Sequence, residues 1–350
     1  ALASIAGGSP VYGQFNAVSL ERRTAWPVLQ PEAGVAMDAL AIDRLVEASS
    51  AVVRHVRFGA VVSADTAELP GWVVEAPPGD FAQMVEAHAR ALAAAWGGKT
   101  VGLDVYADAL THQAVEDRIG VAGVRRLFQA AGFAQPEARL NLRLDDGLTV
   151  GRITAVARRV DALTGRLVPI GGLTLTQRVD GVLQQEGVRR SLERAAALGL
   201  PVTIAELEVS GASPIAAAVN LETLLRHAFA TPGIEGVYFR GVEAGELVSA
   251  RAALVVGGGE ATPAGKVLEG LFGAVWRSRV EARADEVGNV RARVFAGRYL
   301  AEVQLPDGTA CTARFHVPLS RETVAVVVQP MRHQAEAGVG QRGEAAAPTW

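Results

Sequence analysis

Acidic side chains recur at alternate positions in two short β-rich segments, and this spacing is the first candidate for chemistry. Asp104, Tyr106 and Asp108 alternate in one segment, and Glu206 and Glu208 alternate in the other, where Thr203 lies on the opposite face, toward the predicted helices. Because alternate residues of a strand face the same side, we expect these carboxyl groups to converge at one mouth of a sheet or barrel. Two opposed carboxyl groups about 5–5.5 Å apart, one ionised and one protonated, suit retaining hydrolysis of a glycosidic bond.

Basic residues in the same pattern support a second interpretation, in which the acids belong to a structural network. Asn141, Arg143 and Asp145 share one face of a third β-rich segment, and Arg240 lies in the last such segment. Guanidinium groups at these places would neutralise the carboxylates, and polar barrel mouths hold ion pairs of this kind without catalysis. The residue types alone leave both interpretations open.

Short β-rich runs alternate with longer stretches of helical periodicity, which is typical of β/α units around a parallel sheet. The predicted strands are Phe15–Ser19, His55–Val62, Val101–Asp108, Arg139–Asp145, Val168–Thr176, Val202–Val209 and Gly236–Val242. The predicted helices include Met37–Ser50, Phe81–Trp96, Val121–Ala131, Thr149–Leu163, Gly187–Leu198 and Pro214–Ala230. The repeat predicts a (β/α)8 TIM barrel rather than an open doubly wound sheet, whose first turn would carry a glycine fingerprint.

The two ends of the chain depart from this repeat. Leu2–Ala6 is the candidate eighth strand, and the short connection after it predicts an abbreviated first unit. Beyond a helix over Thr262–Trp276, period-two alternation predicts a small antiparallel β module. Its strands would be Tyr299–Leu305, Cys311–Val317 and Thr323–Val328, with a turn at Pro306–Gly308. We therefore predict a barrel over residues 1–279, a β module over 280–330 and a mobile tail or linker over 331–350.

The composition excludes several classes of function. The 350 residues carry 34 basic and 37 acidic side chains, and a net charge of -3 gives no indication of nucleic-acid binding. Apolar runs are shorter than a membrane span needs, so we expect no membrane insertion. One cysteine, Cys311, excludes an internal disulfide framework, and the 6 histidines lack ligand spacing, so we expect no metal or other cofactor. The opening at Ala1 without a leader suggests a processed or excerpted chain.

Four segments carry motifs in a fixed order along the chain. They are Phe15–Glu21 with Trp26, Leu69–Trp72, Gly102–Ala109 and Ile204–Glu208. Together they resemble the motifs of the xylanase-type glycoside hydrolases of family 10. The resemblance implies a (β/α)8 barrel from about Phe15 to Trp276, with Asp108 at the acid/base position and Glu206 at the nucleophile position. The β module after it resembles the C-terminal extension of plant-type members.

The resemblance also implies positions for sugar binding, and most of them hold altered residues. The substrate-binding candidates are Glu21, Trp26, Thr174, Thr176, Arg240 and Glu208. Glu21 keeps a sugar-contacting carboxylate, whereas Thr174 and Thr176 replace Gln and His, and Arg240 replaces a Trp that stacks on sugar. Asp108 is one methylene shorter than the usual Glu, and each lost contact removes about 1–3 kcal/mol of transition-state binding. We also predict that Arg240 pairs with Glu206 or Asp108.

The leading interpretation is therefore a carbohydrate-associated protein on a xylanase-type scaffold with impaired catalysis. It would act in binding or within a larger assembly with polysaccharide or protein partners, and the resemblance implies an extracellular or cell-surface glycoprotein. One alternative is an active retaining endo-β-1,4-glycanase, with Glu206 as nucleophile and either Asp108 or Asp145 as its carboxyl partner. Another is a purely structural assembly module whose cleft has no role.

Overall fold

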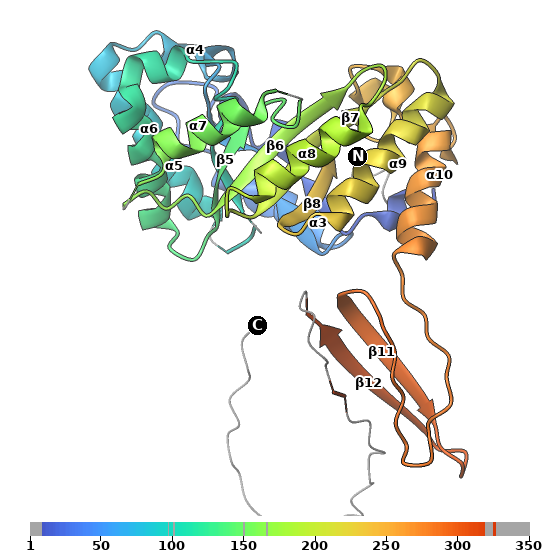
Figure 1. Cartoon of the computed structure of the whole chain (residues 1–350). Coiled ribbons are helices and arrows are strands. Elements are labelled where there is room, and N and C mark those ends of the chain that lie inside the picture. The colour runs from blue at the N-terminus through green and yellow to red at the C-terminus, as the bar shows by residue number, and fades with distance from the viewer. Residues whose placement is uncertain are drawn as a thin grey trace, which may run out of the picture. The chain divides into compact units, whose positions relative to one another are not determined.

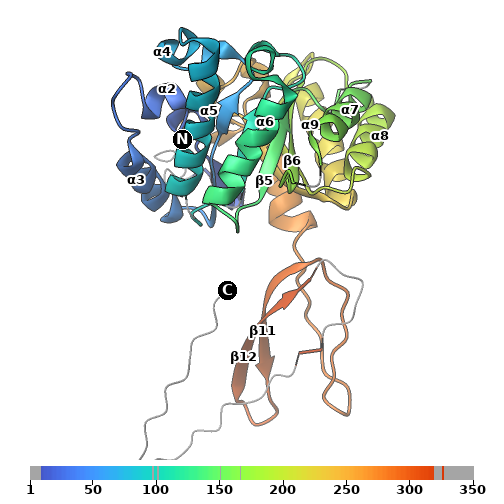
Figure 2. The ribbon, with the colours of Figure 1, turned by 90° about the vertical axis from the view of Figure 1, so that its left-hand side faces the viewer.

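The computed structural model describes residues 9–318 except 97, 101, 150 and 166, together with residues 325 and 326. The chain forms two compact units that divide between Ala274 and Val275. The first unit holds the parallel strands and the helices that surround them (Figures 1 and 2). Across the part of the chain that is described, every helix is too short or too polar to span a lipid bilayer.

Parallel strands form the centre of the first unit. They are β1 (Ala17–Ser19), β2 (His55–Arg57), β3 (Ala60–Ser63), β4 (Leu103–Ala107), β5 (Leu140–Leu144), β6 (Gly172–Val179), β7 (Val202–Val209) and β8 (Ile234–Phe239). Strands β3 to β8 form a six-stranded sheet in chain order, and β1 pairs with β2. The sequence predicted β2 and β3 as one strand, and the structure interrupts this strand at Phe58 and Gly59.

Helices follow most of the strands and pack outside them. The helices are α2 (Trp26–Leu29), α3 (Ala39–Ser50), α4 (Gly71–Val74), α5 (Pro78–Trp96), α6 (Ala114–Ala134), α7 (Ile153–Leu163), α8 (Gln185–Ala196), α9 (Pro214–Ala230) and α10 (Pro263–Gly270). The helix predicted from Thr149 begins only at Ile153, because Asp146 and Gly147 form a turn after β5. Figure 2 shows α5, α6, α7 and α8 as an outer layer over the strands.

The two ends of the parallel strand series meet. Phe15, just before β1, packs edge-on against Phe239 at the end of β8, with ring centroids 5.8 Å apart. The chain thus has the (β/α)8 barrel fold, and among the described residues seven strand positions are filled, with β2 and β3 sharing one. The predicted strand Leu2–Ala6 lies outside the described residues.

The second unit contains an antiparallel hairpin, as the alternation predicted. Strand β11 (Gly297–Gln304) pairs with β12 (Ala310–Val317), and Tyr299 lies opposite Phe315. The turn between them contains Gly308 with a φ of 85°, a backbone conformation that glycine adopts without steric cost. One face of the hairpin carries apolar side chains, including the buried Cys311. Most of the predicted strand Thr323–Val328, and the predicted tail over 331–350, lie outside the described residues.

Candidate active site

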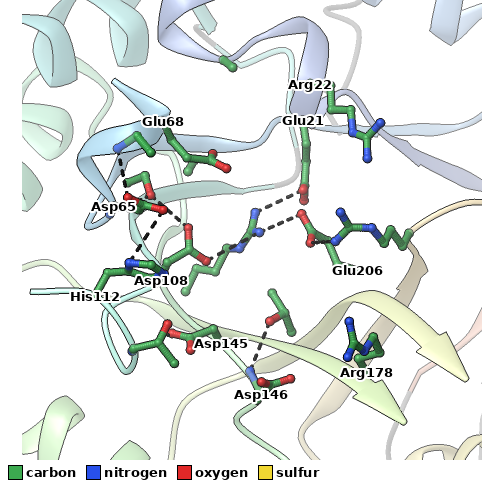
Figure 3. A pocket seen from close by; sticks show the side chains of 18 of the residues that line it. Glu21, Arg22, Asp65, Glu68, Asp108, His112, Asp145, Asp146, Arg178 and Glu206 are labelled. Carbon is green, nitrogen blue, oxygen red and sulfur yellow. Dashed lines mark hydrogen bonds and ion pairs between the residues drawn. The ribbon is translucent and has the colours of Figure 1, made fainter. Parts of the chain in front are cut away.

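A cavity of about 820 Å³ opens where the parallel strands end. Its lining comes from β3, from the last residues of β5, β6 and β7, and from the loops that follow β1, β3, β4, β5, β6 and β8. This is the end of a β/α barrel at which active sites are built. Figure 3 shows that carboxylate and guanidinium groups converge there from opposite sides.

A buried arginine forms the centre of the cluster. Arg143, at 7% exposure, projects from β5. Its Nη1 lies 3.1 Å from Glu21 Oε2, and its Nη2 lies 2.7 Å from Glu206 Oε1 and 3.9 Å from Asp108 Oδ1. One guanidinium therefore contacts three carboxyl groups that come from three different strands of the barrel.

Both carboxylate oxygens of Glu206 are paired with arginine. Arg143 holds Oε1, and Nη1 of Arg240 lies 3.0 Å from Oε2. We predicted that Arg240 pairs with Glu206 or Asp108, and the structure confirms the pair with Glu206. Since Arg240 follows β8, the neighbour of β7, the two side chains reach the rim side by side. Two guanidinium groups of the protein thus pair with the carboxylate at the nucleophile position.

A close approach of two backbones places Glu21 beside Glu206. A Cβ atom at Gly59, between β2 and β3, would lie 2.7 Å from the Glu21 Cα, so only glycine fits there. Burial raises the pKa of Glu21 to about 8, and Glu206 adds to the increase although Arg143 opposes it. At neutral pH Glu21 is therefore protonated and hydrogen-bonds to Glu206.

The pKa of Glu206 moves in the opposite direction. Burial opposes its ionisation, but the hydrogen bond with Glu21 and the charges of Arg143 and Arg240 outweigh burial and lower its pKa. Glu206 is therefore an ionised carboxylate at neutral pH. The two side chains form one strongly coupled pair, in which Glu21 holds the proton.

Asp108 is a third buried carboxyl group with a different environment. Burial raises its pKa, while Arg143 and the hydroxyl of Ser63, which donates to Oδ2 at 3.0 Å, lower it. Asp108 Oδ1 and Glu206 Oε1 both lie near Nη2 of Arg143. The distance between these two oxygens therefore cannot exceed the sum of their distances to that nitrogen. This limit is compatible with the spacing of about 5–5.5 Å in retaining glycosidases.

Unusual backbone geometry also marks the rim. Among the described residues, the non-glycine residues with positive φ are Asp108 at 60°, Asp146 at 47° and Glu206 at 45°, and all three line the cavity. This conformation costs roughly 1–2 kcal/mol for a residue with a side chain. Strained residues cluster at functional sites, because the surrounding structure must hold them in place.

A family comparison decides how this site is classified. The model of glycosyl hydrolase family 10 matches residues 7–246, which include every strand of the barrel described above. The chain belongs to glycosyl hydrolase family 10. The resemblance stated from the motifs is thereby confirmed, as is the xylanase-type scaffold of this family.

Relatives with curated descriptions include plant endo-1,4-beta-xylanases. Endo-1,4-beta-xylanase 2 of Arabidopsis thaliana is 27% identical over 262 residues, which are 73% of this chain and 24% of the relative. Endo-1,4-beta-xylanase 1 of the same plant is 25% identical over 326 residues, which are 90% of this chain and 33% of the relative. The chain spans about a quarter to a third of the length of these relatives.

Solved structures of family 10 xylanases share the barrel. Xylanase 10B from Thermotoga petrophila RKU-1, in complex with xylobiose, matches with a TM-score of 0.64 at 21% identity, over 74% of this chain and 86% of that one. The family 10 xylanase from Bispora sp. MEY-1 with xylobiose matches with a TM-score of 0.66 at 16% identity, over 75% of this chain and 91% of that one. Likeness at this level of identity establishes the fold.

The remaining sugar-binding candidates lie in different surroundings. Thr176 and Glu208 line the cavity, and Glu208 accepts hydrogen bonds from the backbone N–H groups of Val248 and Ser249 at 3.1 and 2.6 Å. Trp26 lines the cavity but is 3% exposed and stacks on His88, with ring centroids 3.7 Å apart.

Thr174 lies in the interior of the barrel rather than at the mouth. It is fully buried, and its hydroxyl donates to Asp104 and accepts from Arg57, both at 2.7 Å. Thr174 is not one of the described residues that line the cavity. A direct contact with sugar at this position is therefore not supported by the geometry.

Two side-chain orientations predicted from strict alternation are wrong. Tyr106 was expected to share a face with Asp104 and Asp108, but its ring lies 6.0 Å from the guanidinium carbon of Arg159 on α7. The β4–β5 register shifts between Asp104 and Tyr106, which turns Tyr106 toward the helices. Thr203 was expected to face the helices but lines a second cavity, of about 280 Å³, and the β7–β8 register shifts between Val202 and Thr203.

Sequence reasoning missed the central place of Arg143. It appeared as one of several neutralising cations, whereas the structure gives it contacts with three carboxyl groups. Ser63 and Glu68 also line the cavity without having been predicted as part of the site. Within the described residues, acidic, histidine and cysteine side chains form no group that could hold a metal ion.

Proposed function

We propose that this chain is a carbohydrate-associated protein on a xylanase-type family 10 scaffold whose hydrolytic activity is impaired. The observation that carries the proposal is the pairing of both Glu206 oxygens with Arg143 and Arg240. A nucleophile must present a free oxygen to the anomeric carbon, and displacing two charge-assisted contacts from buried groups opposes that step.

The substitutions around Glu206 support the same proposal. Arg240 stands where the resemblance implies a sugar-stacking Trp, and Asp108 is shorter than the Glu of the family motif. A displacement of a proton donor on the order of 1 Å can cost about a hundredfold in rate. The cavity of about 820 Å³ is large enough to hold a saccharide. Binding can therefore survive where turnover does not.

One observation favours an active retaining glycanase as the second candidate. The pKa of Asp108 is raised and that of Glu206 is lowered, which is the division of roles that an acid/base and a nucleophile require. In this alternative the substrate displaces the guanidinium groups when it binds. The two candidates make opposite predictions for turnover and the same prediction for binding.

The decisive experiment measures hydrolysis and binding in the same preparation. Xylan and aryl xylosides are incubated with the native chain, with Glu206→Gln and with Glu193→Gln, a control on the exposed face of α8. We expect retention on xylan in affinity electrophoresis and no turnover above that of Glu206→Gln. Turnover by the native chain and by Glu193→Gln that Glu206→Gln abolishes would establish the active glycanase instead.

We also propose that the protein works outside the cell, in an assembly with polysaccharide or protein partners. The support is the family relationship. One structural neighbour, from Thermoanaerobacterium saccharolyticum, is by contrast described as an intracellular xylanase, so the location has to be tested directly. Fractionation of the source cells tests this part of the proposal. Recovery of the protein only from the soluble cell interior would contradict it.

A further inference from the structure

A second cavity, the lower cavity, lies where the parallel strands begin, at the end of the barrel opposite the mouth. Its volume is about 280 Å³, and its lining comes from residues near the starts of β1, β4, β5, β7 and β8 and from β2. The interior of a β/α barrel is normally filled by layers of large branched side chains. Two positions of this lining hold Ala17 and Gly236 instead, so the layer is incompletely filled.

Gly236 leaves room that a side chain can occupy. It pairs in register with Thr203 on β7. A Cβ atom at this position would meet Tyr238 Cε2 at 3.5 Å and Thr203 Cγ2 at 4.0 Å, which are ordinary van der Waals distances. The backbone of Gly236 does not have the positive φ that favours glycine. Neither packing nor backbone geometry therefore requires glycine here, and its effect is to keep the lower cavity open.

The arginines around the lower cavity are paired with carboxylates. Arg57 donates to Asp104, and Arg139 forms an ion pair with Glu235. Nη1 of Arg57 forms no hydrogen bond with the described residues, but protein atoms cover it almost completely, so a ligand cannot reach it. His55 also lines the cavity and interacts with the protein. An ionic ligand would therefore compete with the protein's own ion pairs for a counter-charge.

Neutral polar groups of the lining remain available to a ligand. Thr203 is 7% exposed, and its hydroxyl forms no hydrogen bond within the described part of the chain. Asn141, at 3% exposure, donates its Nδ2 to Asp104 at 3.3 Å, which leaves its Oδ1 to accept. Burial raises the pKa of Tyr238, so its phenol is neutral at pH 7 and can donate or accept. Buried polar groups without partners cost free energy, so these groups favour a hydrogen-bonding occupant.

The lower cavity reaches the surface beside the pair of Arg139 and Glu235, whose side chains are 31% and 44% exposed. Arg139 precedes β5 and Glu235 lies on β8, so the pair crosses the starts of β6 and β7. Added Cβ atoms at Gly171 and Gly172 would lie 3.2 Å from the Cγ and 3.3 Å from the Cδ of Arg139, so glycines give this side chain its path. An exposed ion pair contributes little to stability, so opening it to admit a small molecule costs little.

We propose that the lower cavity is a second binding site, separate from the mouth, which takes a neutral polyhydroxylated molecule about the size of one sugar unit. Ligand hydroxyl groups both donate and accept, as the side chains of Thr203, Asn141 and Tyr238 do together. A charged ligand would lose its hydration without gaining a free counter-charge. The inference does not depend on whether the mouth binds or hydrolyses a polysaccharide.

Ligand-observed NMR titration with three probes tests the chemical class. The probes are sorbitol, gluconate and glucamine, which share one carbon skeleton and differ at one end, in a hydroxyl, a carboxylate and an ammonium group. We expect sorbitol to bind at least about tenfold more tightly than either charged analogue. Equal or tighter binding of gluconate or glucamine would overturn the assignment to a neutral ligand.

A substitution at Gly236 tests the location. Gly236→Val fills the space without a change of charge, and it should lower the affinity for sorbitol at least about tenfold because its methyl groups occupy the volume of the ligand. The matched control is Gly79→Val, at an exposed glycine of α5 where an added Cβ meets no atom within 4 Å. The control should leave the affinity unchanged.

Removal of one hydroxyl tests the recognition itself, and it keeps the inference falsifiable where Gly236→Val fails to fold. Thr203→Val should lower the affinity for sorbitol about three- to tenfold, because one neutral hydrogen bond is lost at nearly constant shape. Thr164→Val, at the end of α7 and outside the described lining, is the control and should have no effect.

The outcomes separate this site from the mouth. Retention on xylan should be the same for Gly236→Val and the native chain, while sorbitol binding is lost. Unchanged sorbitol affinity in Thr203→Val, or losses as large in Gly79→Val and Thr164→Val, would contradict the location. Failure of all three probes to bind would mean that water alone satisfies these groups, and it would overturn the inference without touching the proposed function.

Discussion

Two arginine–carboxylate clusters lie in this barrel, and they differ in their balance of charge. The interior cluster pairs Arg57 with Asp104, at 2% and 0% exposure, and adds Thr174 and Asn141 as neutral hydrogen-bond partners. The mouth cluster places the buried guanidinium of Arg143 against Glu21, Asp108 and Glu206. The interior cluster has one anion for its cation, whereas the mouth cluster has three carboxyl groups.

This difference separates a structural role from a functional one. The charges of the interior pair cancel, and its atoms are closed to solvent. The mouth cluster reduces its excess of negative charge by holding a proton on Glu21, and its carboxylates remain 18–25% exposed. A cluster that is unbalanced, protonated and open to a cavity is poised to interact with a ligand.

The largest effect is expected from breaking the interior pair. Asp104→Ala leaves Arg57 charged and without its counter-ion in a closed site, which should lower the free energy of unfolding by about 3–5 kcal/mol. Chemical denaturation measures the loss. The double variant Arg57→Met with Asp104→Leu removes both charges and should be less destabilised than Asp104→Ala. A loss of stability in the double variant that equals the sum of the losses in the two single variants at Arg57 and Asp104 would show that the two charges are not coupled.

Removal of the central arginine tests the mouth cluster in the same way. Arg143→Met brings Glu206 and Asp108 together without a cation, and we expect a loss of about 2–3 kcal/mol at pH 7, below the interior value because these carboxylates are partly exposed. Without Arg143 their pKa values rise, so the folded variant takes up protons as the pH falls. Its deficit should therefore be smaller at pH 5 than at pH 7. An equal deficit at both values would contradict the electrostatic origin.

The proton on Glu21 predicts how stability changes with pH. Its pKa is about 8 in the folded protein and 4.5 as the ordinary value, so between these limits the folded state binds more protons than the unfolded state. The stabilisation is complete below pH 4.5 and is lost as the pH rises through 8. Glu206, with its lowered pKa, acts in the opposite sense and loses its contribution only as the pH falls below 4.5.

A neutral amide at position 21 isolates this contribution. Glu21→Gln keeps a hydrogen-bond donor toward Glu206 but cannot ionise, so its unfolding free energy should fall less steeply than that of the native chain from pH 4.5 to 8. Thermal unfolding across this range compares the two proteins. Parallel pH profiles would show that Glu21 is not the group that holds the proton.

The sequence revealed the barrel and most of the carboxylates, because hydrophobic periodicity and motif order both repeat along the chain. It also predicted that Arg240 pairs with Glu206 or Asp108, and the structure shows the pair with Glu206. It could not predict the register shift that turns Tyr106 outward, because alternation within one strand carries no information about pairing with the next. The contact between Glu21 and Glu206 could not be predicted either, because it depends on closure of the barrel.

The role of Arg143 shows the same limit. Its position on the face shared with Asp145 was visible in the sequence, but its partners come from three other strands. Long-range contacts between charged groups depend on strand tilt and on the positive φ values at Asp108 and Glu206. A local pattern therefore predicts which charges reach the mouth of the barrel, but not which of them pair.

The smallest expected effects come from one hydroxyl in each cluster, and they sharpen the contrast between the two. Thr174→Val removes a hydroxyl that bridges Asp104 and Arg57 in a closed site. The two partners then lack a hydrogen bond, and the free energy of unfolding should fall by about 1–3 kcal/mol.

Ser63→Ala removes one hydrogen-bond donor from Asp108. Water can replace this donor because the Asp108 side chain is 21% exposed, so the free energy of unfolding should fall by about 0.5–1 kcal/mol. The pKa of Asp108, which Ser63 lowers, should also rise in this variant. Denaturant titration of both variants measures the difference, and equal losses would mean that the mouth is as closed as the interior.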